Sequence, residues 1–197
     1  MRNFWKPQLK RAELIVGYLT HPPITSISTI IDFGAAGMIK DNKRSLHKDL
    51  IDQLPHANVI GVDARESDYT DIKHDLNIFP YPFKNESITN IVAGEVIEHL
   101  HNPYEFLKEC HRLLKKGGRM IITTPSAEGI QLLMGRESPW HFYIWTLKDF
   151  KILCKETGLK IKFATRLNIY YNRNLLLRGL GYIIPKLRPT LFFVLEK

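Results

Sequence analysis

The sequence has few cysteines and no long apolar run. Its 197 residues contain only two cysteines, Cys110 and Cys154. Each falls on the apolar side of a predicted helix, so we expect buried hydrophobic side chains and neither a disulfide nor a zinc site. No apolar run approaches the roughly 20 residues that a membrane-spanning helix needs, and the start of the chain is polar where a signal peptide would be apolar. We therefore expect a cytoplasmic protein.

The charge of the chain is unevenly distributed. Residues 1–98 carry 11 Lys and Arg against 13 Asp and Glu, whereas residues 99–197 carry 17 against 7. A basic C-terminal half attracts anionic partners, and it leaves nucleic acid, an anionic membrane surface and acidic metabolites open as partner classes. The sequence has no internal repeat, and its length suits a single domain over residues 1–197.

Short apolar runs alternate with segments of helical periodicity, which predicts an α/β fold. We expect one doubly wound, mostly parallel, Rossmann-like sheet of about seven strands with an antiparallel C-terminal strand. The predicted strands are 27–33, 58–63, 71–76, 87–95, 119–125, 159–170 and 189–197. The predicted helices are 4–19, 45–54, 102–116 and 146–157. The first helix forms an N-terminal arm within residues 1–25.

Helix 102–116 has the clearest boundary signals. Asn102 can cap it, Pro103 suits its first position, and Glu105 stands three residues after the cap. Lys115 and Lys116 before Gly117 and Gly118 suit its C-terminal end. Thr146 and Gly158 mark the start and the end of the helix at 146–157 in the same way.

Polar and small residues follow the predicted strands, where ligands bind in a doubly wound sheet. Asp32-Phe33-Gly34-Ala35-Ala36-Gly37 closes the first strand, and its small residues let the backbone approach a ligand and offer N–H groups. Asp63 ends the second strand about 30 residues later, a distance that suits an acid accepting hydrogen bonds from a ribose diol. A plain turn and an ordinary helix cap are the alternative interpretations.

Two further strand ends carry candidate residues. Asp75 and Leu76 follow the third strand, and Gly94-Glu95-Val96 follows the fourth, with Glu98 and His99 close behind. Taken singly, each of these positions is as consistent with a structural role as with a functional one.

Together, these segments resemble the class I S-adenosylmethionine-dependent methyltransferases. The resemblance covers about residues 28–126. Within the family, the sequence is similar in particular to the branch that includes ubiquinone-biosynthesis and related small-molecule methyltransferases. It is carried by IIDFGAAG, NVIGVDARE and the long stretch HDLNIFPYPFKNESITNIVAGEVIEHLHNPYEFLKECHRLLKKGGRMIITTPS.

The resemblance implies S-adenosylmethionine as cofactor and S-adenosylhomocysteine as product. It implies that the loop Gly34-Ala35-Ala36-Gly37, with Asp32 before it, holds the methionine part. Asp63, followed by Ala64, would hold the ribose hydroxyls. Asp75 with Leu76 would hold the adenine, and Gly94, Glu95 and Val96 the sulfonium side.

The glycine loop departs from the family pattern. The family loop usually runs Asp-x-Gly-x-Gly-x-Gly, whereas Ala36 and Met38 stand here where the second and third glycines would align. The departure suggests a rearranged loop, and it leaves open weakened cofactor binding or a non-catalytic relative that serves as a binding or partner module.

Candidate acceptor residues lie in two places. His99 is the candidate base for a hydroxyl acceptor, the alternative being a structural hydrogen bond at a helix entrance. The aromatic segment GRESPWHFYIWT supplies the acceptor candidates Trp140, His141 and Tyr143, the alternative being a hydrophobic clasp between a strand and a helix. Residues 127–146 and 170–189 are the expected acceptor-side segments, and 170–189 is either an amphipathic cover or a buried helix with solvated basic residues.

The leading hypothesis is therefore a methyltransferase that acts on an unidentified small-molecule, lipid-like or glycan-like acceptor, without a metal. An RNA methyltransferase is the alternative enzyme, favoured by the basic C-terminal half. A nicotinamide oxidoreductase is disfavoured because the loop lacks the G-x-G-x-x-G pattern.

Overall fold

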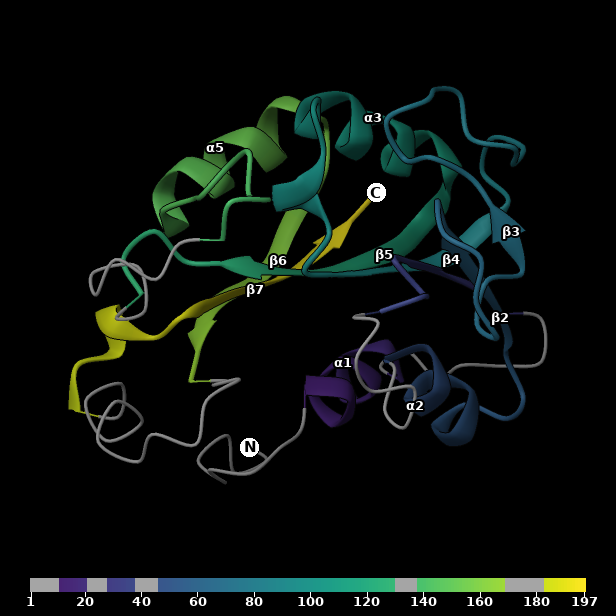
Figure 1. Cartoon of the computed structure of the whole chain (residues 1–197), viewed down its shortest axis with the longest axis horizontal. Coiled ribbons are helices and arrows are strands. Elements are labelled where there is room, and N and C mark those ends of the chain that lie inside the picture. Colours follow the sequence, from purple (N-terminus) through teal and green to yellow (C-terminus); the bar gives the residue numbers. More distant parts are fainter. Residues whose placement is uncertain (1–10, 21–27, 38–45, 130–137, 169–182) are drawn as a thin grey trace.

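The apolar runs become the strands of one mixed sheet (Figure 1). The computed structural model describes residues 11–20, 28–37, 46–129, 138–168 and 183–197. Within these residues the sheet has seven strands in the order β3-β2-β1-β4-β5-β7-β6. They are β1 Thr29–Phe33, β2 Asn58–Asp63, β3 Ile72–Lys73, β4 Ile88–Gly94, β5 Leu114–Pro125, β6 Lys160–Leu167 and β7 Thr190–Glu196. The predicted seven-stranded sheet is confirmed.

The strand directions also agree with the prediction. β1 pairs in parallel with β2 on one side and with β4 on the other, and β4 pairs in parallel with β5. β7 is antiparallel to both of its neighbours, β5 and β6. β3 is shorter than the predicted 71–76, because the chain turns at Asp75, whose carbonyl accepts the Ile78 N–H at 2.9 Å and whose carboxylate accepts the Asn77 N–H at 2.9 Å.

Helices cover both faces of the sheet (Figure 1). The helices α1 (Arg11–Leu19) and α2 (Leu46–Gln53) lie on one face, and α3 (Pro103–Leu113) and α5 (Leu147–Glu156) lie on the other. Two short 3-10 helices, η1 (Ile97–His99) and η2 (Pro185–Leu187), connect elements. Because side chains alternate along a strand, Ile30 packs in the core beneath α1 and α2, while Ile31 packs in the core beneath α3 and α5.

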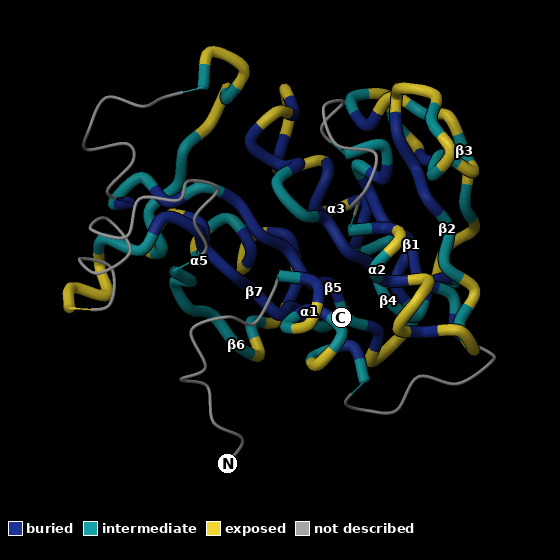
Figure 2. The backbone as a smooth tube through the Cα atoms, turned by 60° about the horizontal axis from the view of Figure 1, so that its bottom comes forward, coloured by how far each residue is buried: buried dark blue, intermediate teal, exposed yellow. Residues whose placement is uncertain are grey.

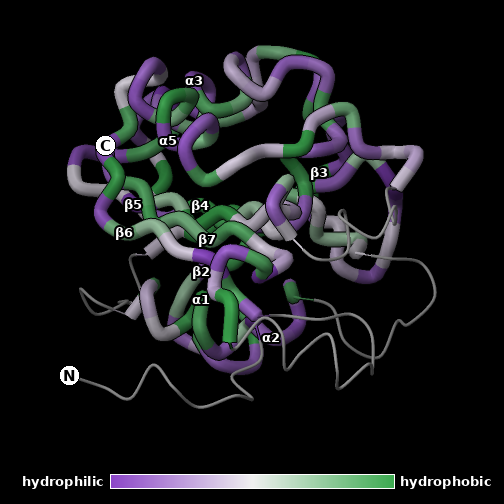
Figure 3. Tube along the Cα trace, turned by 90° about the vertical axis from the view of Figure 1, so that its left-hand side faces the viewer, coloured by the Kyte–Doolittle hydropathy of each residue, from purple (hydrophilic) through white to green (hydrophobic). Residues whose placement is uncertain are grey.

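The buried residues are concentrated in the central strands. Figure 2 shows β5 and β7 as buried along most of their length, and Figure 3 shows hydrophobic stretches on the strands with hydrophilic ones around the outside. Cys110 of α3 and Cys154 of α5 are both free and buried, as predicted. The sheet therefore has two cores, one on each face.

The predicted starts of α3 and α5 are confirmed, and the predicted end of α3 is wrong. Asn102 accepts the Glu105 N–H at 3.1 Å, and Thr146 accepts the Asp149 N–H at 3.1 Å. However, α3 ends at Leu113 and not at residue 116. The reason is that the next residue, Leu114, is buried and pairs with Ile88 of β4, so the backbone already belongs to the sheet there.

Some predicted features lie outside the described residues. These are residues 4–10 of the first predicted helix, Met38 in the departure from the glycine pattern, and residues 170–182 of the predicted amphipathic cover. Among the described residues, no helix is long and apolar enough to cross a membrane.

The cap of α3 gives a stability prediction. Replacing Asn102 with Ala removes the acceptor for the Glu105 N–H, so we expect the free energy of unfolding to fall by about 1 kcal/mol. Urea denaturation followed by circular dichroism measures it. Asn102→Asp keeps a capping oxygen and should be close to wild type; an Ala variant as stable as the Asp variant would contradict the capping role.

Candidate functional site

Three of the predicted cofactor positions lie side by side at one edge of the sheet. Phe33 of β1 is level with Val62 of β2 and with Ala93 of β4. The next residues along the three strands are Gly34, Asp63 and Gly94. Since neighbouring strands lie about 4.8 Å apart, these residues occupy adjacent positions where ligands bind in this class of sheet.

Gly34, the first residue of the glycine loop, is packed so closely against Val96 that a larger residue does not fit there. Gly34 has a φ of 82°, and a Cβ there would lie 2.6 Å from Cγ2 of Val96. Gly37 also has a positive φ, 60°. The loop therefore lies directly against the segment after β4, which brings two of the predicted cofactor segments together.

Asp63 fixes the loop. Its Oδ2 accepts the Ala36 N–H at 3.1 Å, and its Oδ1 accepts the Arg65 N–H at 2.8 Å. Nε of Arg65 also lies 3.4 Å from Oδ1. An ionised carboxylate has about four acceptor positions, so these contacts leave capacity for a ligand hydroxyl. Ala64, the next residue, is exposed.

Asp32 is buried beneath the loop and paired with a histidine that the sequence analysis did not select. Its Oδ2 lies 3.3 Å from Nδ1 of His47, which is also buried, and Nε2 of His47 lies 3.9 Å from Asp71. Burial raises the pKa of Asp32, and His47 opposes that shift. His47, at the start of α2, thus connects the end of β1 with the residue before β3. A role of Asp32 in cofactor binding stays a prediction.

The predicted adenine residues follow β3. Lys73 is level with Asp63, so Asp75 lies two residues further along. Asp75 is exposed, and its Oδ1 accepts the Asn77 N–H at 2.9 Å. Leu76 is buried in the core. In the loop after β3, Asp75 therefore presents an exposed carboxylate, whereas Leu76 is turned into the core.

The segment after β4 has a strained backbone and a buried acid. Glu95 has a φ of 60°, and its N–H donates to the Thr123 carbonyl at 2.9 Å. Its Oε1 lies 3.8 Å from Nη1 of Arg11 at the start of α1. Burial raises the pKa of Glu95, and Arg11 opposes that shift. A Cβ at Gly94 would lie 2.9 Å from Cδ2 of Leu46, the end of a side chain at the start of α2, so Gly94 lies close to that helix.

Glu98 is more deeply buried than Glu95, with an exposure of 1%. Its Oε2 accepts the hydroxyl of Thr124 at 3.0 Å, and its backbone carbonyl accepts the Phe142 N–H at 2.8 Å. Burial, followed by the charge of Glu95, raises the pKa of Glu98 well above its usual range. Glu98 therefore ties the segment after β4 both to β5 and to the aromatic segment.

His99, the candidate base, contacts the predicted acceptor residues. Its Nδ1 lies 2.8 Å from the Trp140 carbonyl oxygen, and its ring centroid lies 4.9 Å from that of His141. Its side chain is 43% exposed. Burial lowers the pKa of His141. The predicted structural hydrogen bond of His99 is present, and the ring is still open to a ligand.

The aromatic segment divides into an exposed and a buried part. Trp140 is 74% exposed and Phe142 is 59% exposed. Trp145 packs against the core, with Tyr143 stacked on it at 5.3 Å between centroids and Phe150 edge-on at 5.6 Å. The hydrophobic clasp is thus formed at Trp145, whereas Trp140 and Phe142 remain open to an acceptor.

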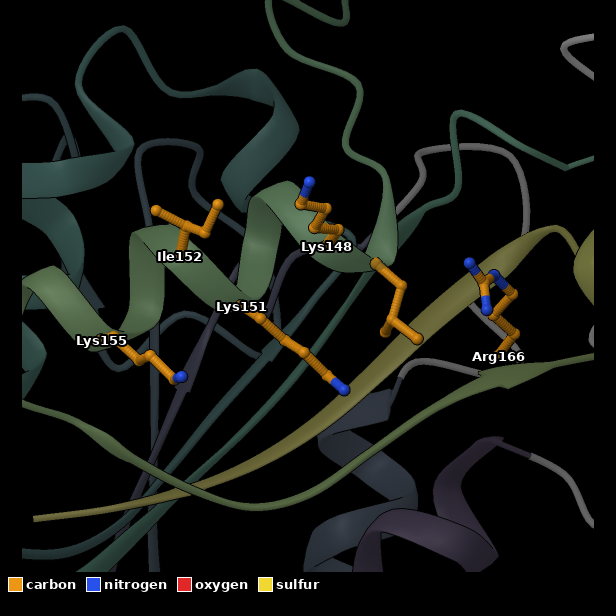
Figure 4. Close-up of a pocket in the computed structure, with 6 residues that line it drawn as sticks. Lys148, Lys151, Ile152, Lys155 and Arg166 are labelled. Carbon is orange, nitrogen blue, oxygen red and sulfur yellow. The ribbon is translucent and has the colours of Figure 1, made fainter.

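A pocket of about 400 Å³ lies on the basic C-terminal half. Figure 4 shows Lys148, Lys151 and Lys155 along α5, with Arg166 on β6 opposite them. Arg166 is level with Leu191 of β7, which is level in turn with Thr124 of β5. The pocket therefore begins at the same edge of the sheet as the predicted cofactor residues.

Comparison with known proteins finds similarity to methyltransferases. Residues 45–122 match a family described as "Methyltransferase domain". A probable S-adenosylmethionine-dependent methyltransferase of Mycolicibacterium smegmatis is 36% identical over 69 residues, which is 35% of this chain and 26% of that protein. The mitochondrial ubiquinone biosynthesis O-methyltransferase of Rattus norvegicus is 36% identical over 50 residues, 25% of this chain and 14% of that protein. The matches thus span about a quarter or less of these relatives.

A solved structure shares the fold across most of the chain. The geranyl diphosphate C-methyltransferase of Streptomyces coelicolor, solved with Mg²⁺, geranyl diphosphate and S-adenosylhomocysteine, has a TM-score of 0.69 at 14% identity. The similarity covers 94% of this chain and 78% of that one.

The Asp32–His47 pair gives a second stability prediction. His47→Leu keeps most of the side-chain volume but leaves a buried carboxylate without its partner, so we expect a loss of about 3 kcal/mol in the free energy of unfolding at neutral pH. Since burial raises the pKa of Asp32, the ionised form is the penalised one, and the loss should shrink as the pH falls toward about 4.

The double variant His47→Leu/Asp32→Asn is the control. It removes the unpaired charge and should recover part of the loss, as measured by a urea denaturation cycle. Equal losses in the single and the double variant, at every pH, would show that packing and not charge accounts for the effect.

Proposed function

We propose that the chain is a class I S-adenosylmethionine-dependent methyltransferase that transfers the methyl group of that cofactor to a small-molecule, lipid-like or glycan-like acceptor. The observation that carries the proposal is the adjacency of Gly34, Asp63 and Gly94 at the ends of β1, β2 and β4. Each offers what the cofactor needs at that position, namely a close backbone, a carboxylate and a residue without a side chain.

The residues at this edge fit the cofactor. The small residues of the loop Gly34–Gly37 would let the methionine part of the cofactor approach the backbone, whose N–H groups already donate to the Val62 and Gly34 carbonyls and to Asp63. Asp63 would accept hydrogen bonds from the ribose diol. Asp75 and Leu76 would contact the adenine. The segment Gly94–Val96 would border the sulfonium, where the nearby Glu95 carboxylate complements a positive charge. The cofactor, when bound, supplies a methyl group that its sulfonium already activates.

The chain's own contribution is to align the acceptor and exclude water. The reaction forms a bond between the acceptor atom and the methyl carbon, breaks the carbon–sulfur bond with its electron pair going to sulfur, and releases a proton from the acceptor. If the acceptor is a hydroxyl, His99 would take that proton. Its Nδ1 faces a carbonyl oxygen, so the neutral ring keeps the lone pair on Nε2 for this role.

The acceptor class is inferred from the exposed aromatic side chains. Trp140 is open to solvent next to His99, and Phe142 is open to solvent beside the ring of His101. Aromatic surfaces bind the apolar or ring portion of a small molecule. These contacts favour an acceptor with a flat or apolar part.

RNA methylation is the second candidate, and the basic pocket between α5 and Arg166 favours it. Nucleic-acid binding weakens steeply as salt rises. If a labelled RNA oligonucleotide binds with such a dependence, and Lys151→Glu together with Lys155→Glu abolishes binding, RNA becomes the preferred acceptor. Absence of salt-dependent binding leaves the small-molecule proposal in place.

Cofactor binding is the direct test of the proposed function. We expect S-adenosylmethionine and S-adenosylhomocysteine to bind with one-to-one stoichiometry in calorimetric titration. Asp63→Ala should weaken binding by about 10- to 100-fold, since a hydrogen bond to a charged group contributes about 1.5–3 kcal/mol.

The matched control is Asp68→Ala, an exposed acid five residues further along the same connection. It should bind the cofactor like the wild type. Circular dichroism on both variants separates loss of binding from loss of folding. If the folded wild-type chain binds neither ligand at millimolar concentration, the enzyme proposal is wrong and the non-catalytic partner module takes its place.

A further inference from the structure

Three side chains with metal-binding atoms meet between η1 and the aromatic segment. Among the described residues, Glu98, His99 and His141 place one ligand atom each within 4.8 Å of one another. Glu98 and His99 are consecutive, whereas His141 comes from the segment before α5. The fold therefore assembles a mixed carboxylate and imidazole cluster from two separate parts of the chain.

Glu98 contributes a buried oxygen that the rest of the structure does not satisfy. Its Oε2 accepts the hydroxyl of Thr124, but its Oε1 has no hydrogen-bond partner among the described residues. Leaving a buried carboxylate oxygen unpaired costs free energy, because it has lost its hydration. This oxygen faces the histidines, since it lies 4.0 Å from Nε2 of His99.

His99 is oriented as metal-binding histidines are. A carbonyl oxygen only accepts hydrogen bonds, so the contact of Nδ1 with the Trp140 carbonyl at 2.8 Å places the proton on Nδ1. In the neutral ring, the lone pair is then on Nε2. A histidine that binds a metal typically donates its other N–H to a carbonyl or a carboxylate in this way, which fixes the ring and its tautomer.

When Glu98 is ionised, the two atoms that face each other are both acceptors, and a bound cation would favour that ionised form. A separation of 4.0 Å between Oε1 of Glu98 and Nε2 of His99 is too long for a direct hydrogen bond. A cation placed between them would satisfy both. His141 supplies a third ligand on the same side, with its ring 4.9 Å from that of His99.

We propose that Glu98, His99 and His141 bind a divalent transition-metal ion of the zinc class. Two imidazoles with one carboxylate form a set that zinc uses with a fourth position left open. Zinc lies about 2.0–2.2 Å from such ligands, so two of them can be at most about 4.4 Å apart. Small rotations of the two partly exposed histidines bring all three atoms within this range.

A metal ion at this position could take part in the methyl-transfer reaction. Glu98 follows the segment Gly94–Val96 after a single residue, so the ion would lie beside the expected site of methyl transfer. An ion with an open position binds and polarises oxygen groups. If the proposed function holds, His99 is then a metal ligand and not the base, and the acceptor atom is an oxygen.

The experiment is a zinc titration of the untagged, full-length chain after removal of metals with a chelator, followed by calorimetry. We expect one zinc ion per chain. His99→Ala and His141→Ala should each weaken binding by about a hundredfold or more, since loss of a mere supporting contact already costs roughly 10- to 100-fold. Glu98→Gln keeps the side-chain shape and should also weaken binding.

The matched control is His101→Ala, which removes an exposed histidine two residues from His99 and outside the cluster. It should bind zinc like the wild type. Cobalt(II) provides a second readout, because its visible spectrum reports the ligand set and should change in the His141 variant only if His141 is a ligand. Circular dichroism verifies that each variant is folded.

Zinc binding that is unchanged in all three cluster variants would overturn the proposal, as would no stoichiometric binding by the wild type. Tight binding of magnesium in place of zinc would overturn the zinc-class assignment. The titration is performed without cofactor, and the cofactor titration is performed with a chelator present. Failure of the metal site is therefore distinguishable from failure of the proposed function.

Discussion

The parallel register that β1 shares with β2 and β4 is the constraint on which the site depends. Because Phe33 is level with both Val62 and Ala93, the chain leaves all three strands at the same height. Gly34, Asp63 and Gly94 are then neighbours, and the hydrogen bond from the Ala36 N–H to Asp63 holds the rest of the glycine loop beside them. A shift of one residue in either pairing would reverse the faces of a whole strand, and the two cores, one on each side of the sheet, prevent it.

The same edge of the sheet collects buried acids, and each acid is compensated differently. Asp32 is paired with His47, and Glu95 lies near Arg11. Glu98 has a hydroxyl on one oxygen and nothing on the other among the described residues. A buried acid without a partner lowers the stability of the fold, and such groups are found mostly at functional sites. The two compensated acids hold loops against the sheet, and the third leads to the proposed metal site.

The sequence predicted the elements well wherever local signals and packing agree. The caps at Asn102 and Thr146 depend on neighbours within four residues, so they were predicted and confirmed. The end of α3 was predicted too late, because the burial of Leu114 against Ile88 of β4 is not encoded by the lysines and glycines that follow it. β3 was predicted too long, because the pattern of residues 71–76 does not reveal that a turn begins at Asp75.

The candidate site could be predicted only in part. Strand-end positions were found because a parallel sheet aligns them. His47 and Arg11 were missed because no spacing rule connects them to Asp32 and Glu95. The cluster of Glu98 with His141 was missed for the same reason, although His99 and His141 had each been selected singly.

The most direct test of the account is a crystal structure of the chain grown with S-adenosylhomocysteine. The account predicts the ribose hydroxyls on Asp63, the amino-acid end at the loop Gly34–Gly37 and the sulfur beside Gly94–Val96. Ligand density elsewhere, or saturating ligand that leaves this edge of the sheet empty, would contradict it.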